Sequence, residues 1–222
     1  MAVPLFIIAA TVCRFMRDPN WDPREQLEKI QELRRVGDLE QMEQTYRPIL
    51  KHLHRGLTES RDRERLYDQF RTIIGVIISL AEPLSAILLA TLLNMSLNAV
   101  TRRLYPLHSV LQIPIDLNLP IRTLYLSFPE FLLSDRYQQE PFGINSPATY
   151  RMLLTKCLNL LSGSSGLREN LCGLQYPGQR RQEVDRAALD KYLPPAIQYA
   201  CRYWVHHIQY SMIQIVDDDK VH

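Results

Sequence analysis

The segment from Ile73 to Met95 is a nearly continuous run of apolar residues with Glu82 and Pro83 at its centre. Placing a carboxylate at the middle of a bilayer costs about 2.5–3.5 kcal/mol on insertion scales. Pro83 also divides the run into two pieces, each too short to cross a membrane. We therefore expect two buried helices, one on each side of Pro83, and no membrane span.

Composition favours a helical protein over a β protein. Glycine supplies only 8 of the 222 residues, hydrophobic residues make up 46%, and Leu and Ile are abundant. Scarce glycine is typical of helices rather than of a turn-rich β protein. The 26 basic and 24 acidic residues leave a formal net charge of +2, whereas a nucleic-acid binder usually has a basic excess. We expect a mainly α fold and no nucleic-acid partner.

Apolar residues recur at helical spacing through most of the chain. The expected helices cover residues 22–36, 38–53, 63–80, 83–94, 96–111, 129–133, 146–161, 167–174 and a long segment from 194 to 215. Ser96 and Ser146 are the expected N-caps of their helices, and Pro48 is expected to kink or break its helix. The stripe of the last helix includes Trp204, which we expect to be largely buried.

The order of elements also indicates how the chain is divided. Two short helices, a proline-broken loop, a short strand at 121–126 with alternating apolar residues, and a further helix suit a winged-helix domain. We expect a helical linker region at 23–82, a winged-helix-like domain at 83–133 and a C-terminal helical region at 134–222.

The motifs of common enzyme classes are missing from the sequence. It has no Gly-rich phosphate-binding loop, no G-x-S-x-G turn and no H-E-x-x-H motif. His52 and His54 are two residues apart and His206 and His207 are adjacent, whereas metal ligands on one helix face need a spacing of three or four. We expect no catalytic residue, no metal site and no cofactor.

The four cysteines, at 13, 157, 172 and 201, form no C-x-x-C pair. In a chain of this length they are expected to be reduced, which favours a cytoplasmic protein. The apolar segment Val3–Val12 is similar to the core of a secretory signal but lacks a preceding basic residue, so a signal peptide is the less favoured alternative.

Two groups of charged residues are expected to lie in solvent and to bind nothing. The run Asp217–Asp219 lacks the alternating oxygen ligands of a calcium loop, so we expect it to be a solvated tail. Arg102 and Arg103 fall on the second helix of the expected winged helix, where a DNA reader would place basic residues. One basic pair in a nearly neutral chain is better explained as a solvated helix face.

Several long motifs follow one another along the chain. They are IIGVIISLAEPLSAILLATLL at 73–93, RRLYPLHSVL at 102–111, IRTLYLSFPEFLL at 121–133, CGLQYPGQRRQEVD at 172–185 and KYLPPAIQYACRYWVHHI at 191–208. In this order they resemble fungal NACHT–WD-repeat proteins, the NLR-like STAND proteins of vegetative incompatibility. Residues 1–22, with FIIAATVCRF and Trp21–Pro23, resemble the end of the NACHT module.

The resemblance implies a regulatory role without catalysis. In this family a NACHT nucleotide-binding module precedes a winged-helix and helical segment, and ligand-sensing repeats follow. The chain resembles the segment between the two, so we expect a fragment or truncated paralogue that relays the state of the repeats to the nucleotide-binding core. Its expected partners are the NACHT module and WD repeats of the same parent or of a relative.

One position departs from the family pattern. The family usually has a histidine two residues before the Ser of its L-S-F-x-x-F-L motif, and related STAND proteins use a winged-helix histidine to reach the nucleotide phosphate. This chain has Tyr125 there. A phenol donates a hydrogen bond but is not cationic near neutral pH. Tyr125 is therefore only a weak candidate for a nucleotide contact, and a half-buried structural ring is the preferred interpretation.

Two alternatives to the relay stay open at this point. A standalone helical adaptor that binds NACHT–WD-repeat relatives would use the same helices but would need a stable fold of its own. A winged-helix DNA binder would show salt-dependent retention on DNA.

Overall fold

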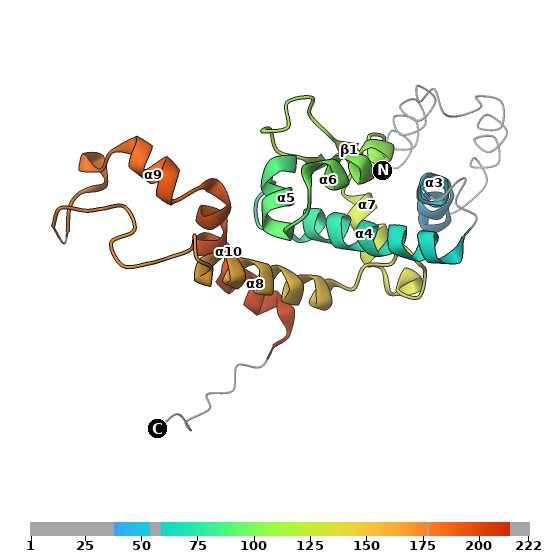
Figure 1. Cartoon of the computed structure of the whole chain (residues 1–222). Coiled ribbons are helices and arrows are strands. Elements are labelled where there is room, and N and C mark those ends of the chain that lie inside the picture. The colour runs from blue at the N-terminus through green and yellow to red at the C-terminus, as the bar shows by residue number, and fades with distance from the viewer. Residues whose placement is uncertain (1–37, 54–58, 177, 214–222) are drawn as a thin grey trace.

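The computed structural model describes residues 38–53, 59–176 and 178–213 (Figure 1). Its helices are α3 (Asp38–His52), α4 (Ser60–Ser79), α5 (Ala86–Leu93), α6 (Leu97–Leu104), α7 (Ser127–Leu133), α8 (Ser146–Ser162), α9 (Arg186–Tyr192) and α10 (Pro195–Ser211). Short 3-10 turns are η2 (Tyr105–Leu107), η3 (Asp135–Tyr137) and η4 (Arg181–Glu183). The two strands, β1 (Leu111–Gln112) and β2 (Arg122–Thr123), are short. The expected mainly α fold is confirmed.

Some expectations fall on residues that the structure does not describe. The NACHT-like segment 1–22, the helix expected at 22–36 and the acidic run 217–219 lie outside the described ranges.

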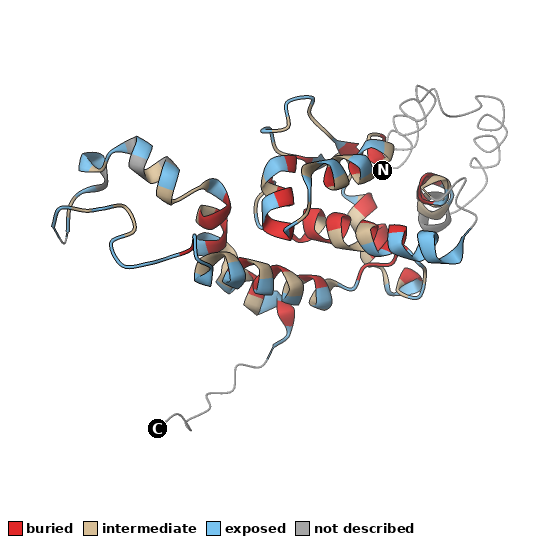
Figure 2. Cartoon of the chain, viewed as in Figure 1, coloured by how far each residue is buried: buried red, intermediate tan, exposed pale blue. Residues whose placement is uncertain are grey.

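The division of the long apolar run at Pro83 is confirmed. Helix α4 ends at Ser79, and the chain is extended at Leu80. Helix α5 begins three residues after Pro83, because Oγ of Ser85 accepts a hydrogen bond from the Leu88 amide at 3.2 Å and caps the new helix. Both helices are lined with buried residues, and α4 runs through the middle of the core (Figure 2).

The two strands form an antiparallel pair that lies beside the start of α5. Leu111 is opposite Thr123 and Gln112 is opposite Arg122. A single bridge joins Ser85 to Pro120, so the segment before α5 also lies against this pair. The strand expected at 121–126 is shorter than predicted, because the chain leaves the ladder after Thr123 and Leu126 is 81% exposed.

Helix α3 is held against α7 by aromatic packing. The ring of Tyr46 lies 5.3 Å from Phe128 and 5.4 Å from Phe131, centroid to centroid. The Tyr46 hydroxyl is also 2.7 Å from Oγ of Ser127. Helix α3 continues past Pro48 to His52, so the proline does not break it as the sequence suggested it could.

Helices α8 and α10 pack along each other and complete the core. Helix α8 is capped by Asn145, whose side chain accepts from the Ala148 amide at 2.9 Å, and not by Ser146 as expected. The asparagine takes this role because Ser146 is already the first helical residue and Asn145, with extended backbone, occupies the N-cap position.

The long C-terminal helix, expected at 194–215, runs from Pro195 to Ser211 and buries only part of the expected stripe. Its buried residues are Ala196, Ile197, Tyr199, Ala200, His207 and Ser211. Trp204 is only partly buried, and Cys201 is exposed. The helix expected at 167–174 is absent; Asn170, at a positive φ of 47°, forms a turn there and accepts a hydrogen bond from Leu174.

Candidate functional site

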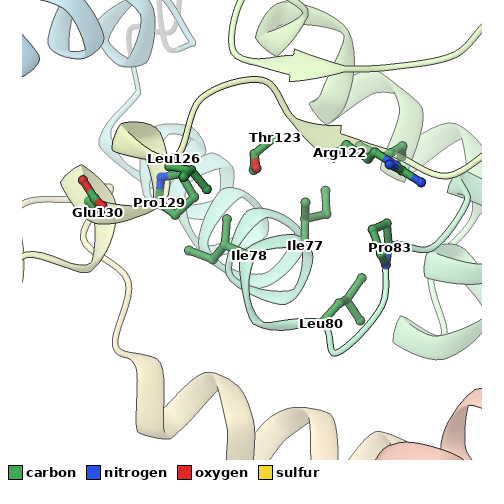
Figure 3. A pocket seen from close by; sticks show the side chains of 10 residues that line it. Ile77, Ile78, Leu80, Pro83, Arg122, Thr123, Leu126, Pro129 and Glu130 are labelled. Atoms are coloured by element: carbon green, nitrogen blue, oxygen red, sulfur yellow. The ribbon is translucent and has the colours of Figure 1, made fainter. Parts of the chain in front are cut away.

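An apolar groove lies between the end of α4, strand β2 and the start of α7 (Figure 3). Its volume is about 550 Å³. It is lined by Ile77, Ile78, Leu80, Pro83, Ile121, Arg122, Thr123, Leu126, Pro129 and Glu130.

The walls of the groove come from segments that the backbone ties together. The amide of Ile121 donates to the carbonyl of Leu84 at 2.9 Å, which fixes the start of β2 against the turn after α4. The amide of Leu124 donates to Val110 at 3.0 Å, which holds the end of β2 to β1. The α4 turn and β2 are therefore fixed relative to each other, and the groove is a built feature of the fold.

The groove suits apolar side chains better than it suits catalysis. Arg122 and Glu130 are its charged residues, and both are exposed. No His, Cys or Asp is among the lining residues. General acid–base or nucleophilic chemistry needs such groups within hydrogen-bond distance of one another.

Tyr125 is not part of this lining, although Thr123 and Leu126 on either side of it are. Its carbonyl accepts from the Phe128 amide at 3.3 Å, and its side chain is half-buried. The Tyr125 phenol lies near the phenol of Tyr46. The pKa of Tyr46 is raised by burial, lowered by the hydrogen bond to Ser127 and raised by the nearby Tyr125. Tyr125 thus sits beside α3, outside strand β2.

The loop between β1 and β2 carries exposed apolar side chains. Ile115 is fully exposed and Leu119 is 51% exposed. Between them, the Asp116 carboxylate accepts hydrogen bonds at 3.0 Å from both the backbone amide and the side-chain amide of Asn118. These bonds lower the pKa of Asp116 and form a local turn, so the loop presents its apolar residues from a defined conformation.

Histidines and cysteines do not assemble into a reactive site in the described parts of the chain. These parts contain no group of three His, Cys, Asp or Glu side chains that would hold a metal ion. His207 is buried and its Nε2 lies 3.0 Å from the Tyr199 hydroxyl. Burial raises the pKa of the Cys157 thiol to about 12, so it remains protonated at neutral pH.

From the sequence, the apolar loop at 113–121 is expected to be a protein-binding surface that faces the NACHT module, but the groove is not indicated. Residues such as Ile77 and Leu80 look like ordinary core residues in a helical stripe, and their exposure to a groove depends on where β2 is placed. The apolar character of residues 113–121 was the one usable signal, because it is unusual in a loop.

Comparison of the chain with protein-family models, with curated proteins and with solved structures gave no match. Among the described residues, no helix has the length and apolar character needed to cross a membrane.

Proposed function

We propose that the chain is a non-catalytic regulatory segment of a fungal NACHT-type, NLR-like STAND signalling protein. In this role it relays ligand sensing by the repeats to the nucleotide-binding core. The observation that carries the proposal is the β1–β2 loop, which displays Ile115 and Leu119 to solvent. Exposed apolar side chains on an ordered loop are typical of a protein-binding surface.

The element order supports a winged-helix arrangement within this segment. Helices α5 and α6 are followed by the β1–β2 pair, and the Ser85–Pro120 bridge adds a third short segment beside it. Helix α4 packs against α6, so the proposal takes α4 together with residues 83–133. In this arrangement the β1–β2 loop is the wing.

The β1–β2 loop and the groove together offer a partner two kinds of contact. The loop projects from the body of the molecule beside α5 and α6 (Figure 1), and β2 leads from the loop directly into the groove wall. A NACHT module that covers both would bury apolar area worth about 25 cal/mol per Å². A change in its nucleotide state would then act on β2 at the surface and, across the groove, on α4, whose inner face lies in the core.

Hydrogen exchange of the joined protein tests this proposal. The chain is compared alone and fused behind the NACHT module of a related fungal NACHT–WD-repeat protein. Exchange in residues 113–126 is expected to slow in the fusion, because the module buries the loop and the adjoining groove wall. Unchanged exchange there would contradict the relay role.

A matched pair of variants separates specific docking from general stabilisation. Ile115→Asp with Leu119→Asp is expected to remove the protection in the fusion. Leu167→Asp, at a loop residue that is 50% exposed, is expected to leave it intact. The purified chain alone is also expected to show no Mg²⁺-dependent ATP hydrolysis, since the sequence lacks a phosphate-binding loop.

The adaptor alternative is favoured by one feature, the continuity of the core. Buried residues from Tyr46 in α3 to Ala200 in α10 belong to a single cluster. A cooperative thermal transition of the chain by itself, together with capture of a NACHT–WD-repeat relative added as a separate protein, would support an adaptor over a relay.

A further inference from the structure

Three arginines from two helices lie close together on a surface that the proposed relay does not use. Arg102 and Arg103 are in the last turn of α6, and Arg65 is on α4, which packs against α6. Nε of Arg103 donates to Oε1 of Gln69 at 2.7 Å. Gln69 follows Arg65 by one helical turn, so this bond holds the Arg103 guanidinium above α4 near Arg65.

These three side chains have no acidic partner among the described residues. The ion pairs among the described residues join other arginines to carboxylates, for example Arg47 to Glu43 at 2.8 Å and to Glu140 at 3.1 Å. None of the pairs includes Arg65, Arg102 or Arg103. The fold therefore neutralises arginines elsewhere but holds this group together through a neutral amide.

The electrostatic consequence is visible at Arg103. Partial burial lowers its pKa, and the positive charges of Arg102 and Arg65 lower it further. Each effect disfavours the charged form, so the cations are held together against mutual repulsion. An anion bound between them would relieve that repulsion.

We propose that Arg65, Arg102 and Arg103, here called the arginine cluster, bind an acidic segment of a protein partner through guanidinium–carboxylate pairs. A guanidinium matches a carboxylate with two parallel hydrogen bonds, and such bonds are stronger than neutral ones. Tyr105 lies three residues after Arg102 and is 69% exposed, so its ring adds an apolar contact at the edge of the cluster.

The neighbouring charges favour an acidic peptide over nucleic acid. On α4, the exposed residues just before Arg65 alternate in charge: Arg61, Asp62, Arg63 and Glu64. Duplex DNA carries one charge for about every 1.7 Å of its axis, so a backbone that crosses the cluster would continue past these carboxylates. A short acidic segment places its charges at the cluster alone, which also agrees with the net charge of only +2.

Fluorescence anisotropy tests the proposal with a labelled peptide of six aspartates and with a labelled 20-base-pair DNA duplex, at low salt, where exposed charges are least screened. The full chain is expected to bind the peptide saturably. The variant R65Q/R102Q/R103Q is expected to bind it about tenfold more weakly, or worse. The single variant Arg102→Gln changes an exposed side chain, leaves the Arg103–Gln69 bond in place and is expected to show an intermediate loss.

A control variant removes the same charge elsewhere. Arg168→Gln, Arg180→Gln and Lys191→Gln together change three exposed side chains outside the arginine cluster and are expected to bind the peptide like the unmodified chain. Equal losses in the control and cluster variants would mean that net charge alone attracts the peptide, and would overturn the proposal. So would no binding by the unmodified chain, or tighter cluster-dependent binding of the duplex.

Discussion

The Tyr199 hydroxyl lies 3.0 Å from Nε2 of His207, and both side chains are buried. The two residues are eight apart on α10, which places them on the same face two turns from each other. Nδ1 of His207 is buried without a hydrogen-bond partner among the described residues. Within the described part of the chain, the imidazole therefore has one hydrogen bond, and no carboxylate contributes to its pKa.

This environment predicts a loss of stability in mild acid. Burial, and to a lesser extent the charge of the adjacent His206, lower the pKa of His207 from 6.5 to about 4. As the pH falls below 6.5, His207 binds a proton in the unfolded chain but not in the folded chain, so the free energy of unfolding decreases until the pH reaches about 4. Above 6.5 this histidine contributes no pH dependence.

Urea unfolding at several pH values checks this effect. The free energy of unfolding is expected to fall by on the order of 2 kcal/mol between pH 6.5 and 4 on account of His207. In His207→Gln, whose amide still reaches the Tyr199 hydroxyl, that part of the slope is expected to vanish. An identical slope in both proteins would show that His207 is not the responsible group.

Lys156 makes a contact between α8 and α5 that we expect to stabilise the fold. Its Nζ donates to the carbonyl of Leu93 at 2.9 Å, at the end of α5 where Asn94 adopts a left-handed conformation. A cation at a helix C-terminus satisfies a free carbonyl and interacts favourably with the helix dipole. Lys156→Met is expected to cost about 1–2 kcal/mol.

Chemical denaturation measures the cost at Lys156. The control is Lys191→Met, which changes an exposed lysine and is expected to stay within about 0.5 kcal/mol of the unmodified chain. Equal effects of the two substitutions would argue against the capping contact.

Gly143 occupies a position that has no room for a side chain. A Cβ added there would collide with the backbone carbonyl oxygen of Tyr137, in the turn that leads into α8. Backbone atoms move less readily than side chains, so Gly143→Ala is expected to lower stability by about 2–4 kcal/mol. Gly75→Ala is the comparison: its Cβ would meet Oγ1 of Thr149 at 3.1 Å, a side-chain atom, and the melting temperature is expected to change much less.

The sequence predicted the local elements well where one segment determined them. The apolar stripes indicated most of the helices, although α6 ends at Leu104 rather than at 111 and α9 was not predicted. Pro83 divided the long apolar run, and Ser96 caps α6 as expected, with its Oγ accepting from the Ala99 amide at 3.2 Å. These features depend on interactions within a few residues, so they can be read before the fold is known.

Features that depend on packing between distant segments could not be predicted. Gln69 and Arg103 are 34 residues apart, and no local pattern places an arginine of α6 beside one of α4. The groove likewise needs β2 beside the end of α4. The buried face of α10 was predicted only in part: Ile197 and Ala200 are buried as expected, but His207 and Ser211 are buried too, and these polar residues do not count toward an apolar stripe.

The face of α10 that is buried also sets how much stability is lost when Trp204 is truncated. Full burial on the stripe would predict a loss of about 3–5 kcal/mol for Trp204→Ala. The structure instead leaves the indole partly exposed at the edge of the core, with Tyr199 and Ala200 on the buried side of the helix. Since only part of the ring is removed from water, the expected loss is about 1–2 kcal/mol. Tyr199→Ala, at a side chain that is 1% exposed, is expected to cost clearly more. Urea unfolding of the two variants side by side measures the difference, and a larger loss at Trp204 than at Tyr199 would contradict the face that the structure assigns to α10.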